Sequence, residues 1–391
     1  MDLETAHINI EKTIDRQRPF LGLRSFEEKN RSQFGGRDKE IKELFGLDEN
    51  SVLTVIFGKS GIGKTSLIKA GLIPELQQNF YFPIYARIDY SSSRTPLQQV
   101  RKIVYEKMKD KDADVAEIGD ATLWEYFHNV NLLDDLLTPV LILDQFEEIF
   151  TLGESNKDVP ELLVQLADLA ENRIPLKVQG EYQRLNKTVP THYAELPYRV
   201  VLSLREDYLA RLEELKRYMP SIMNSRFRVV QMTVLKAMDA AIKPGKGLID
   251  ERVAKEIIKK MPGVSQSDFD ILKKREPGRS NLKVEPFLLS LICDRINEKR
   301  IEKGMSKITV DLVSEFNVTD VIHSFYNGTI TPYGENVERA IENCLLTEGG
   351  FRKLQALEEF QNQYGISDET VDQLVDARIL RKEIRDGVYY V

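Results

Sequence analysis

The sequence predicts an α/β core, in which a parallel sheet carries helices on both faces, followed by an α-helical region and a small C-terminal domain. Between residues 52 and 205, short uncharged runs rich in β-branched residues alternate with helical patterns. Such runs are typical of strands that are buried on both faces of a parallel sheet. After Gln231 the strand patterns stop, and residues 236–326 are mostly helical. From Gly334, three helical segments precede a pair of short strands.

Length and composition narrow the possible classes of protein. At 391 residues the chain is too long for one ordinary core, so we expect two or three domains. The net charge of −7 argues against nonspecific binding to nucleic acid. The N-terminus lacks a basic segment followed by an apolar one, and no apolar run is long enough to span a bilayer. We therefore expect a cytoplasmic protein without a membrane partner.

The cysteines and histidines do not indicate a metal site. Cys293 and Cys344 lie in apolar helical surroundings, which favours two buried thiols in a reducing compartment. The four histidines are scattered along the chain, and none lies near a cysteine pair.

The stretch 52–66 joins an apolar strand to a glycine-rich loop and the start of a helix. Residues 58–65 match the phosphate-binding pattern of Gly, four residues and then Gly-Lys-Thr. Its backbone N–H groups converge on phosphate, and the helix dipole adds positive potential. We therefore predict a P-loop NTPase, with Lys64 on the β- and γ-phosphates and the Thr65 hydroxyl on Mg²⁺. The predicted nucleotide contacts in this loop are Gly58, Lys59, Ser60, Gly61, Ile62, Gly63, Lys64, Thr65 and Ser66.

A second element of the predicted site follows the apolar run that ends at Asp144. A strand of this kind delivers a carboxylate to Mg²⁺, directly or through water. Glu147 and Glu148 come just after the strand, at the edge of the sheet where such sites form. Either acid could orient or deprotonate the attacking water, with a slight preference for Glu148. The other acid would then be a solvated residue at a helix start.

Two arginines have both a functional and a structural interpretation. Arg205 ends another predicted strand, where its guanidinium would sense the γ-phosphate. The alternative is an ion pair with Glu206 or Asp207. Arg37 closes a Gly-Gly-Arg turn before a helix, and a turn placed just before a phosphate-loop strand often packs over the nucleotide base. The alternative is a structural turn with a solvated arginine.

The patterns divide the chain into four segments. We predict a lead-in segment at 1–18, a nucleotide-binding domain at 19–235, a helical lid at 236–330 and a C-terminal domain at 331–391. The proline-containing stretch 172–197 is predicted to be an inserted surface loop.

The C-terminal domain has the outline of a winged helix, because three helices precede a hairpin with an Asp-Gly turn. Its third helix, over 367–378, carries four acids and one arginine. An acidic surface is unsuited to the major groove, where it must approach phosphates. The chain stops within the wing strand, so we expect the natural polypeptide to continue beyond Val391.

As a set, these motifs resemble those of the novel STAND NTPases of bacteria, which are signal-transduction ATPases related to the NACHT and NB-ARC proteins. The similarity covers roughly residues 19–391. The motifs that carry it lie at 19–23, 34–37, 58–74, 144–148, 204–209 and 232–244.

The resemblance implies a switch between ADP and ATP. The core, lid and winged helix would close on ADP, and sensing of a ligand would permit ATP exchange and self-oligomerisation. The residues that the resemblance assigns to phosphate and Mg²⁺ are Lys64, Thr65 and Asp144, with Glu147 and Glu148 as hydrolytic acids and Arg205 as sensor.

The resemblance also places Arg37 near the base and equates Pro286 with a lid proline that contacts adenosine. Glu285 departs from the glycine-containing approach that is usual there, and the winged-helix histidine of related switches would fall beyond Val391. Sensing and effector modules, and an unknown trigger such as a phage protein, are the implied partners. Family members serve in phage defence, cell death and transcriptional control, and we take defence signalling as the setting.

Three other functions are alternatives to the switch. A DNA-associated AAA+-like ATPase of the origin-recognition or transposition-helper type also joins a nucleotide core to a lid and a winged helix, and the locally basic segment 243–307 suits it. The acidic third helix argues against it. A GTPase needs an Asn-Lys-x-Asp motif, and neither 156–158 nor 186–188 has that spacing. An inactive scaffold is disfavoured because the phosphate and Mg²⁺ positions are intact.

Overall fold

The computed structural model describes most of the chain and divides it into two compact units. The residues that it describes are 17–49, 51–90, 92–111, 118–129, 137–150, 153, 158–188, 198–264, 283–345, 353–377, 379–380, 383–385 and 388–391. One unit ends at Val313 and the other starts at Ser314. This division lies inside the segment predicted as a helical lid, 236–330. Each unit has a hydrophobic core of its own.

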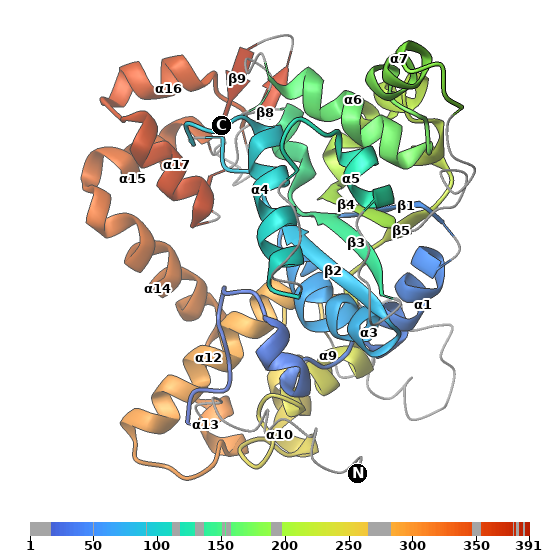
Figure 1. Cartoon of the computed structure of the whole chain (residues 1–391). Coiled ribbons are helices and arrows are strands. Elements are labelled where there is room, and N and C mark those ends of the chain that lie inside the picture. The colour runs from blue at the N-terminus through green and yellow to red at the C-terminus, as the bar shows by residue number, and fades with distance from the viewer. Residues whose placement is uncertain are drawn as a thin grey trace, which may run out of the picture. The chain divides into compact units, whose positions relative to one another are not determined.

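The first unit is built on a five-stranded parallel sheet (Figure 1). Every pair of neighbouring strands is parallel, so the carboxyl ends of all five strands lie at one edge. β1 lies beside β4, which is in turn flanked by β3. In sheet order the strands are β2 (Tyr81–Ala86), β3 (Thr138–Leu143), β4 (Arg199–Arg205), β1 (Leu53–Gly58) and β5 (Arg226–Arg228).

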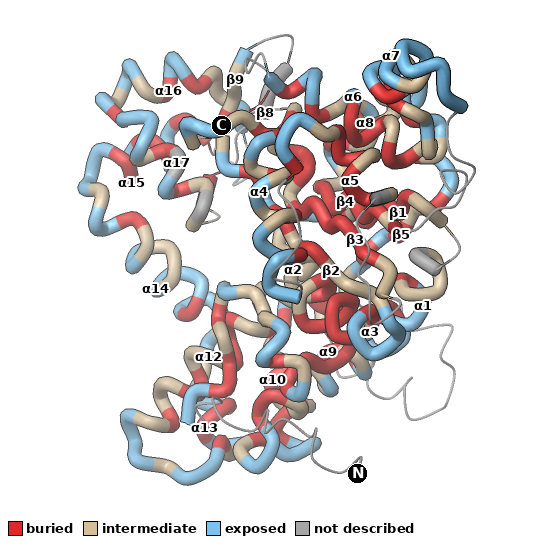
Figure 2. Tube along the Cα trace, viewed as in Figure 1, coloured by how far each residue is buried: buried red, intermediate tan, exposed pale blue. Residues whose placement is uncertain are grey.

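Helices cover both faces of the sheet, as the sequence predicts. Alternate strand residues face opposite sides. Val55 and Leu141 therefore pack in the core beneath α4, α5 and α6, whereas Ile56 and Ile142 pack against α1 and the helical run after β1. β1, β3 and β4 are buried along most of their length (Figure 2). The helices are α1 (Asp38–Glu49), α2 (Lys64–Ser66), a π-helical turn (Leu67–Leu72), α3 (Ile73–Gln78), α4 (Pro96–Lys109), α5 (Leu123–Asn129), α6 (Val159–Ala170) and α8 (Leu209–Glu214).

Two elements of the predicted nucleotide-binding domain differ from the prediction. The stretch 172–197, predicted to be an irregular loop, contains the helix α7 (Leu176–Arg184), while residues 189–197 lie outside the described range. α7 was missed because Val178 is its one buried residue. The edge strand β5 was also missed, because Arg226 and Arg228 leave Phe227 as its one apolar residue.

The rest of the first unit is mainly helical, and it also contains two short strands. β6 (Met232–Thr233) and β7 (Lys283–Val284) pair with each other, so the prediction that strands stop after Gln231 is wrong. Strands of two residues are too short to show an alternating pattern. The helices are α9 (Val234–Ile242), α10 (Glu251–Lys259), α12 (Pro286–Glu302) and α13 (Val310–Ser314). Within the described parts of both units, no helix is long and apolar enough to cross a membrane.

The second unit contains helices followed by an antiparallel pair of strands. Phe360, Val371 and Leu374 are fully buried at the centre of its core. The predicted Asp386-Gly387 turn between the strands lies outside the described residues. The elements are α14 (Val318–Ile330), α15 (Glu335–Leu345), α16 (Leu357–Tyr364), α17 (Asp368–Asp376), β8 (Glu383–Arg385) and β9 (Val388–Tyr390).

Candidate active site

The phosphate loop connects the carboxyl end of β1 to α2. Gly61 and Gly63 adopt φ angles of 73° and 95°, which only glycine tolerates readily. Lys64 Nζ donates hydrogen bonds to the carbonyl oxygens of Gly58 at 3.0 Å and Lys59 at 3.2 Å. The ammonium group is therefore held within the loop. Lys59 and Ser60 are exposed, and Ile62 is buried.

Burial lowers the pKa of Lys64, while the negative charges of Glu147 and Asp144 oppose that shift. A partly desolvated ammonium is stabilised by a bound anion, because the negative charge compensates for the lost solvation of the cation. The electrostatics therefore fit a phosphate ligand at Lys64.

Thr65 and Asp144 are in contact, as expected because they follow β1 and β3, whose carboxyl ends lie at the same edge of the sheet. The Thr65 hydroxyl donates to Asp144 Oδ2 at 2.7 Å, and the Tyr85 hydroxyl donates to the same oxygen at 3.0 Å. Asp144 is buried at the end of β3, where the N–H of Gln145 donates to its other oxygen, Oδ1. A hydroxyl and a carboxylate side by side are the hard oxygen ligands that Mg²⁺ prefers, so this pair fits the ion.

Glu147 and Glu148 lie in different environments. Glu147 is buried, accepts a hydrogen bond at 3.3 Å from the N–H of Arg205, and interacts electrostatically with Lys64. Burial raises the pKa of Glu147, opposed by Lys64 and Arg205. Glu148 instead forms an ion pair with Arg87 at 2.8 Å. Burial raises the pKa of Glu148 to about 7, although Arg87 acts in the opposite direction.

Arg205 lies at the end of β4, close to the same group of charges. Its Nη2 lies 2.9 Å from Asp207 Oδ2, and its guanidinium lies over the ring of Tyr208. The ion pair with Asp207, given above as the structural alternative, is therefore present. The charge of Arg205 still acts on both Lys64 and Glu147.

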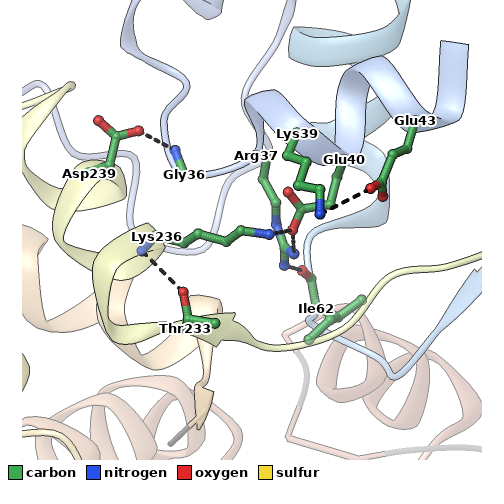
Figure 3. A network of polar contacts seen from close by, with 9 residues as sticks. All are labelled: Gly36, Arg37, Lys39, Glu40, Glu43, Ile62, Thr233, Lys236 and Asp239. Carbon is green, nitrogen blue, oxygen red and sulfur yellow. Dashed lines mark hydrogen bonds and ion pairs between the residues drawn. The ribbon is translucent and has the colours of Figure 1, made fainter. Parts of the chain in front are cut away.

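Arg37 is buried, so the alternative of a solvated arginine is wrong. Its Nη1 donates to Glu40 Oε1 at 2.9 Å, and its Nη2 donates to the carbonyl of Ile62 in the phosphate loop at 3.2 Å (Figure 3). Burial lowers the pKa of Arg37, and Glu40 opposes that shift. The structure thus connects Arg37 to the phosphate loop through protein contacts.

Ser66 is the last residue of α2, directly after the phosphate loop, and Pro286 belongs to α12. The Ser66 hydroxyl accepts a hydrogen bond at 3.1 Å from the N–H of Phe26. Pro286 is the first residue of α12. A Cβ added to Gly61 would lie 3.6 Å from the Cβ of Phe287, so the start of α12 lies against the phosphate loop.

Sequence reasoning missed three side chains of this region. The sequence pattern predicts a single strand over 81–90, which would include both Tyr85 and Arg87, whereas β2 ends at Ala86. They therefore lie at the carboxyl edge of the sheet, where strand-end residues form sites. Lys236 lies within the motif 232–244, but no local pattern predicts its ion pair with Glu40 at 2.7 Å, because the two residues lie far apart in the chain.

Some solved structures are similar in outline to the chain. The Walker-type ATPase PABY2304 of Pyrococcus abyssi is 12% identical, with a TM-score of 0.49 and coverage of 94% of this chain and 95% of that one. The Aeropyrum pernix ORC2 protein, solved as ADPNP–ADP complexes, is 12% identical, with a TM-score of 0.46 and coverage of 90% and 89%. Drosophila ORC bound to DNA is 14% identical, with a TM-score of 0.44 and coverage of 96% and 86%. TM-scores this low support no conclusion about this chain.

No curated protein matches the sequence. A family profile does match: Novel STAND NTPase 1 covers residues 19–263, which is more than half of the chain. This match includes the phosphate loop, Asp144 and the two acids after it, and Arg205. It confirms the resemblance, and with it the prediction of an enzyme that hydrolyses nucleoside triphosphates. The chain therefore belongs to the Novel STAND NTPase 1 family.

Proposed function

We propose that this protein is an ATP-binding, slowly hydrolysing molecular switch, closed with ADP and oligomeric with ATP. The observation that carries the proposal is the contact of Thr65 with Asp144 beside the phosphate loop, with Glu147 buried next to Lys64 and Arg205. This arrangement brings phosphate-binding, metal-binding and water-activating groups to one edge of the sheet. ATP is the proposed nucleotide because the sequence has no Asn-Lys-x-Asp motif for reading guanine.

Each side chain has a proposed role in hydrolysis. Lys64 leaves the loop carbonyls and binds the β- and γ-phosphates, while Thr65 and Asp144 hold Mg²⁺, which would neutralise developing charge. We assign Glu147 to orienting the water, because it faces Lys64, whereas Glu148 is engaged by Arg87. This assignment reverses the slight preference for Glu148 from sequence.

Arg205 is proposed as the sensor of the γ-phosphate. Its guanidinium pairs with Asp207 here, at a side-chain exposure of 15% for the arginine and 40% for the acid. A γ-phosphate carries more negative charge than one carboxylate and would draw the guanidinium away from Asp207. The other residues of the loop, within 58–66, are proposed to donate hydrogen bonds from their backbone N–H groups to the phosphates.

The helical segment 236–330 is proposed to act as a lid, and 331–391 as a winged helix that closes the switch. Support comes from the start of α12, at Pro286, which lies against the phosphate loop. Pro286 and the turn before α1 would then flank the adenosine. Three helices followed by two antiparallel strands suit the winged-helix assignment.

The cellular setting is part of the proposal and rests on family membership alone. We propose a cytoplasmic protein of antiphage defence that oligomerises when a trigger is sensed by modules outside this chain. A phage protein is the proposed class of trigger. Nucleic acid is not a proposed partner, because the sequence of α17 is acidic.

Identifying the nucleotide that purifies with the protein tests this function. The chain is purified without added nucleotide and denatured, and the released molecules are separated by chromatography, with Lys64→Ala as the control. Stoichiometric ADP from the native protein, and none from the variant, is the expected result. An empty site together with fast ATP hydrolysis stimulated by DNA would overturn the switch and favour the DNA-associated ATPase.

A further inference from the structure

The turn before α1 and the first turn of α1 are held against α9 and its C-terminal end by three polar contacts (Figure 3 shows two of them). Residues 236 and 239 in α9 and residue 243, directly after it, are three, four and seven positions apart, so they share one face. The contacts are Lys236 Nζ to Glu40 Oε1 at 2.7 Å, the N–H of Gly36 to Asp239 Oδ2 at 2.5 Å, and Lys243 Nζ to Asp38 Oδ1 at 3.5 Å.

The backbones of the turn and of α9 also approach closely. A Cβ on Gly35 would lie 2.7 Å from the carbonyl oxygen of Asp239, and one on Gly36 would lie 2.2 Å from that of Lys236. Gly36 has a φ of 75° as well, so a side chain there meets both a steric and a conformational barrier. The turn is therefore fitted to α9 at this register.

On its other side, the same turn contacts the phosphate loop. The guanidinium of Arg37 bonds to both Glu40 and the carbonyl of Ile62. Ile62 comes directly before Gly63 and Lys64, the residues that must point toward phosphate. A continuous path of polar contacts thus runs from α9 through Lys236, Glu40 and Arg37 to the loop.

One carboxylate oxygen connects the two cations. Glu40 Oε1 accepts from Arg37 and from Lys236, while Oε2 is buried with no hydrogen-bond partner among the described residues. Burial alone would raise the pKa of Glu40, but the bonds from Lys236 and Arg37 lower it below the ordinary value. Since a buried charge that loses a partner is strongly destabilised, the position of Lys236 affects how Glu40 holds Arg37.

We propose that Lys236 is a positioning residue for the nucleotide phosphates: α9 places Lys236 on Glu40, Glu40 orients Arg37, and Arg37 fixes the carbonyl of Ile62. This inference rests on the proposed nucleotide binding by the phosphate loop. Its consequence is that the affinity for ADP depends on the contact of α9 with Glu40 through Lys236. Coupling of this kind is reciprocal, so bound ADP also stabilises the docked α9.

The test measures the affinity and release rate of a fluorescent ADP analogue, together with the melting temperature without nucleotide, on the full chain. Lys236→Met removes the charge and keeps the length of the side chain. Lys243→Met is the matched control, because Lys243 lies on the same face directly after α9, has a side-chain exposure of 31% against 33%, and contacts Asp38 instead of Glu40. Lys236→Arg is the conservative rescue.

We expect Lys236→Met to weaken ADP binding by roughly ten-fold and to speed its release, while Lys243→Met and Lys236→Arg stay within about two-fold of the wild type. Equal affinity in the two methionine variants overturns the relay and leaves the nucleotide function standing. A lower melting temperature with unchanged affinity also overturns it, since that result describes a purely structural residue. A wild-type chain that binds no nucleotide overturns both.

A second measurement uses the wild-type fold and needs no variant of α9. Hydrogen–deuterium exchange is followed over residues 234–242 with and without ADP, and Lys64→Ala serves as the control that cannot hold phosphate. ADP should increase the protection of these amides in the wild type alone. Unchanged protection in the wild type would contradict the reciprocal coupling.

Discussion

The hydroxyls of Tyr85 and Thr65 donate to the same oxygen of Asp144. Whether Tyr85 orients this carboxylate for Mg²⁺ can be tested by substitution. Tyr85→Phe removes one donor, so the carboxylate is less firmly oriented toward the site of Mg²⁺. We expect the Mg²⁺ concentration needed for half-maximal ADP binding to rise roughly ten-fold, since loss of a hydrogen bond to a metal ligand typically weakens metal affinity by about 10- to 100-fold. Titration of Mg²⁺ against a fixed ADP concentration measures this change.

Tyr90→Phe is the control for that experiment. Tyr90 is another phenol from the same stretch of chain, and burial raises its pKa, but within the described structure no hydrogen bond joins its hydroxyl to Asp144. Its removal should leave the Mg²⁺ requirement unchanged. An equal shift in both variants would show that loss of any nearby phenol, rather than of the bond to Asp144, changes the site.

Glu148 makes stability depend on pH in a defined direction. Its pKa is raised from 4.5 to about 7 by burial, so the folded protein holds a proton that the unfolded chain releases. This proton contributes at most about 3 kcal/mol to the free energy of unfolding. The contribution is present in full below about pH 4.5 and is lost as pH rises through 7. Thermal unfolding of the nucleotide-free protein from pH 5 to 8 measures the loss.

Glu148→Gln removes the titrating group. The variant should become more stable relative to the wild type as pH rises, because glutamine cannot ionise. A constant difference between the two proteins across this range would contradict the raised pKa of Glu148, and would assign the pH dependence to other groups.

At the scale of elements, the turn before α1 has no room for a side chain at Gly36. Gly36→Ala places a Cβ 2.2 Å from the carbonyl of Lys236 at a φ of 75°, so we expect it to destabilise the fold by at least about 2 kcal/mol. Gly180→Ala, in the middle of α7 with no atom within 4 Å of the added Cβ, should stabilise by roughly 0.5–1 kcal/mol. Urea unfolding of both variants checks these signs, and a neutral Gly36→Ala would be incompatible with the docking of the turn on α9.

The parallel strands made much of the candidate site predictable. Lys64, Asp144, Glu147 and Arg205 follow three strands that end at one edge, so their approach to one another follows from strand direction alone. The positions of these residues could be inferred without knowing any contact. Their distinct roles could not, because the partners of Glu147 and Glu148 depend on side-chain packing.

Other contacts had no local signature. Tyr85 belonged to a run that continued the strand pattern, so the end of β2 was not visible in the sequence. The ion pair of Lys236 with Glu40 is a tertiary contact, and periodicity within either helix says nothing about it. α7 was hidden for a related reason, because Leu176 is 85% exposed and only Val178 is buried.

At the scale of the whole molecule, the two units have separate hydrophobic cores. The core residues of the sheet belong to the unit that ends at Val313, while Phe360 and its neighbours belong to the unit that starts at Ser314. The candidate site residues named above all belong to the first unit. Ligand binding stabilises only the cooperative unit that contains its site, unless the two units unfold together.

Calorimetry on the full chain can therefore separate the two units. ADP at 100 times its dissociation constant should stabilise the first unit by about 2.7 kcal/mol and raise the temperature of one transition. Phe360→Ala, at a fully buried position, should lower the other transition, with a cost of about 3–5 kcal/mol. Leu354→Ala, in the same unit at an exposure of 41%, is the control and should leave both transitions nearly unchanged. A single transition that responds to both ADP and Phe360→Ala would mean that the units unfold as one, and the nucleotide would then control the stability of the C-terminal unit as well.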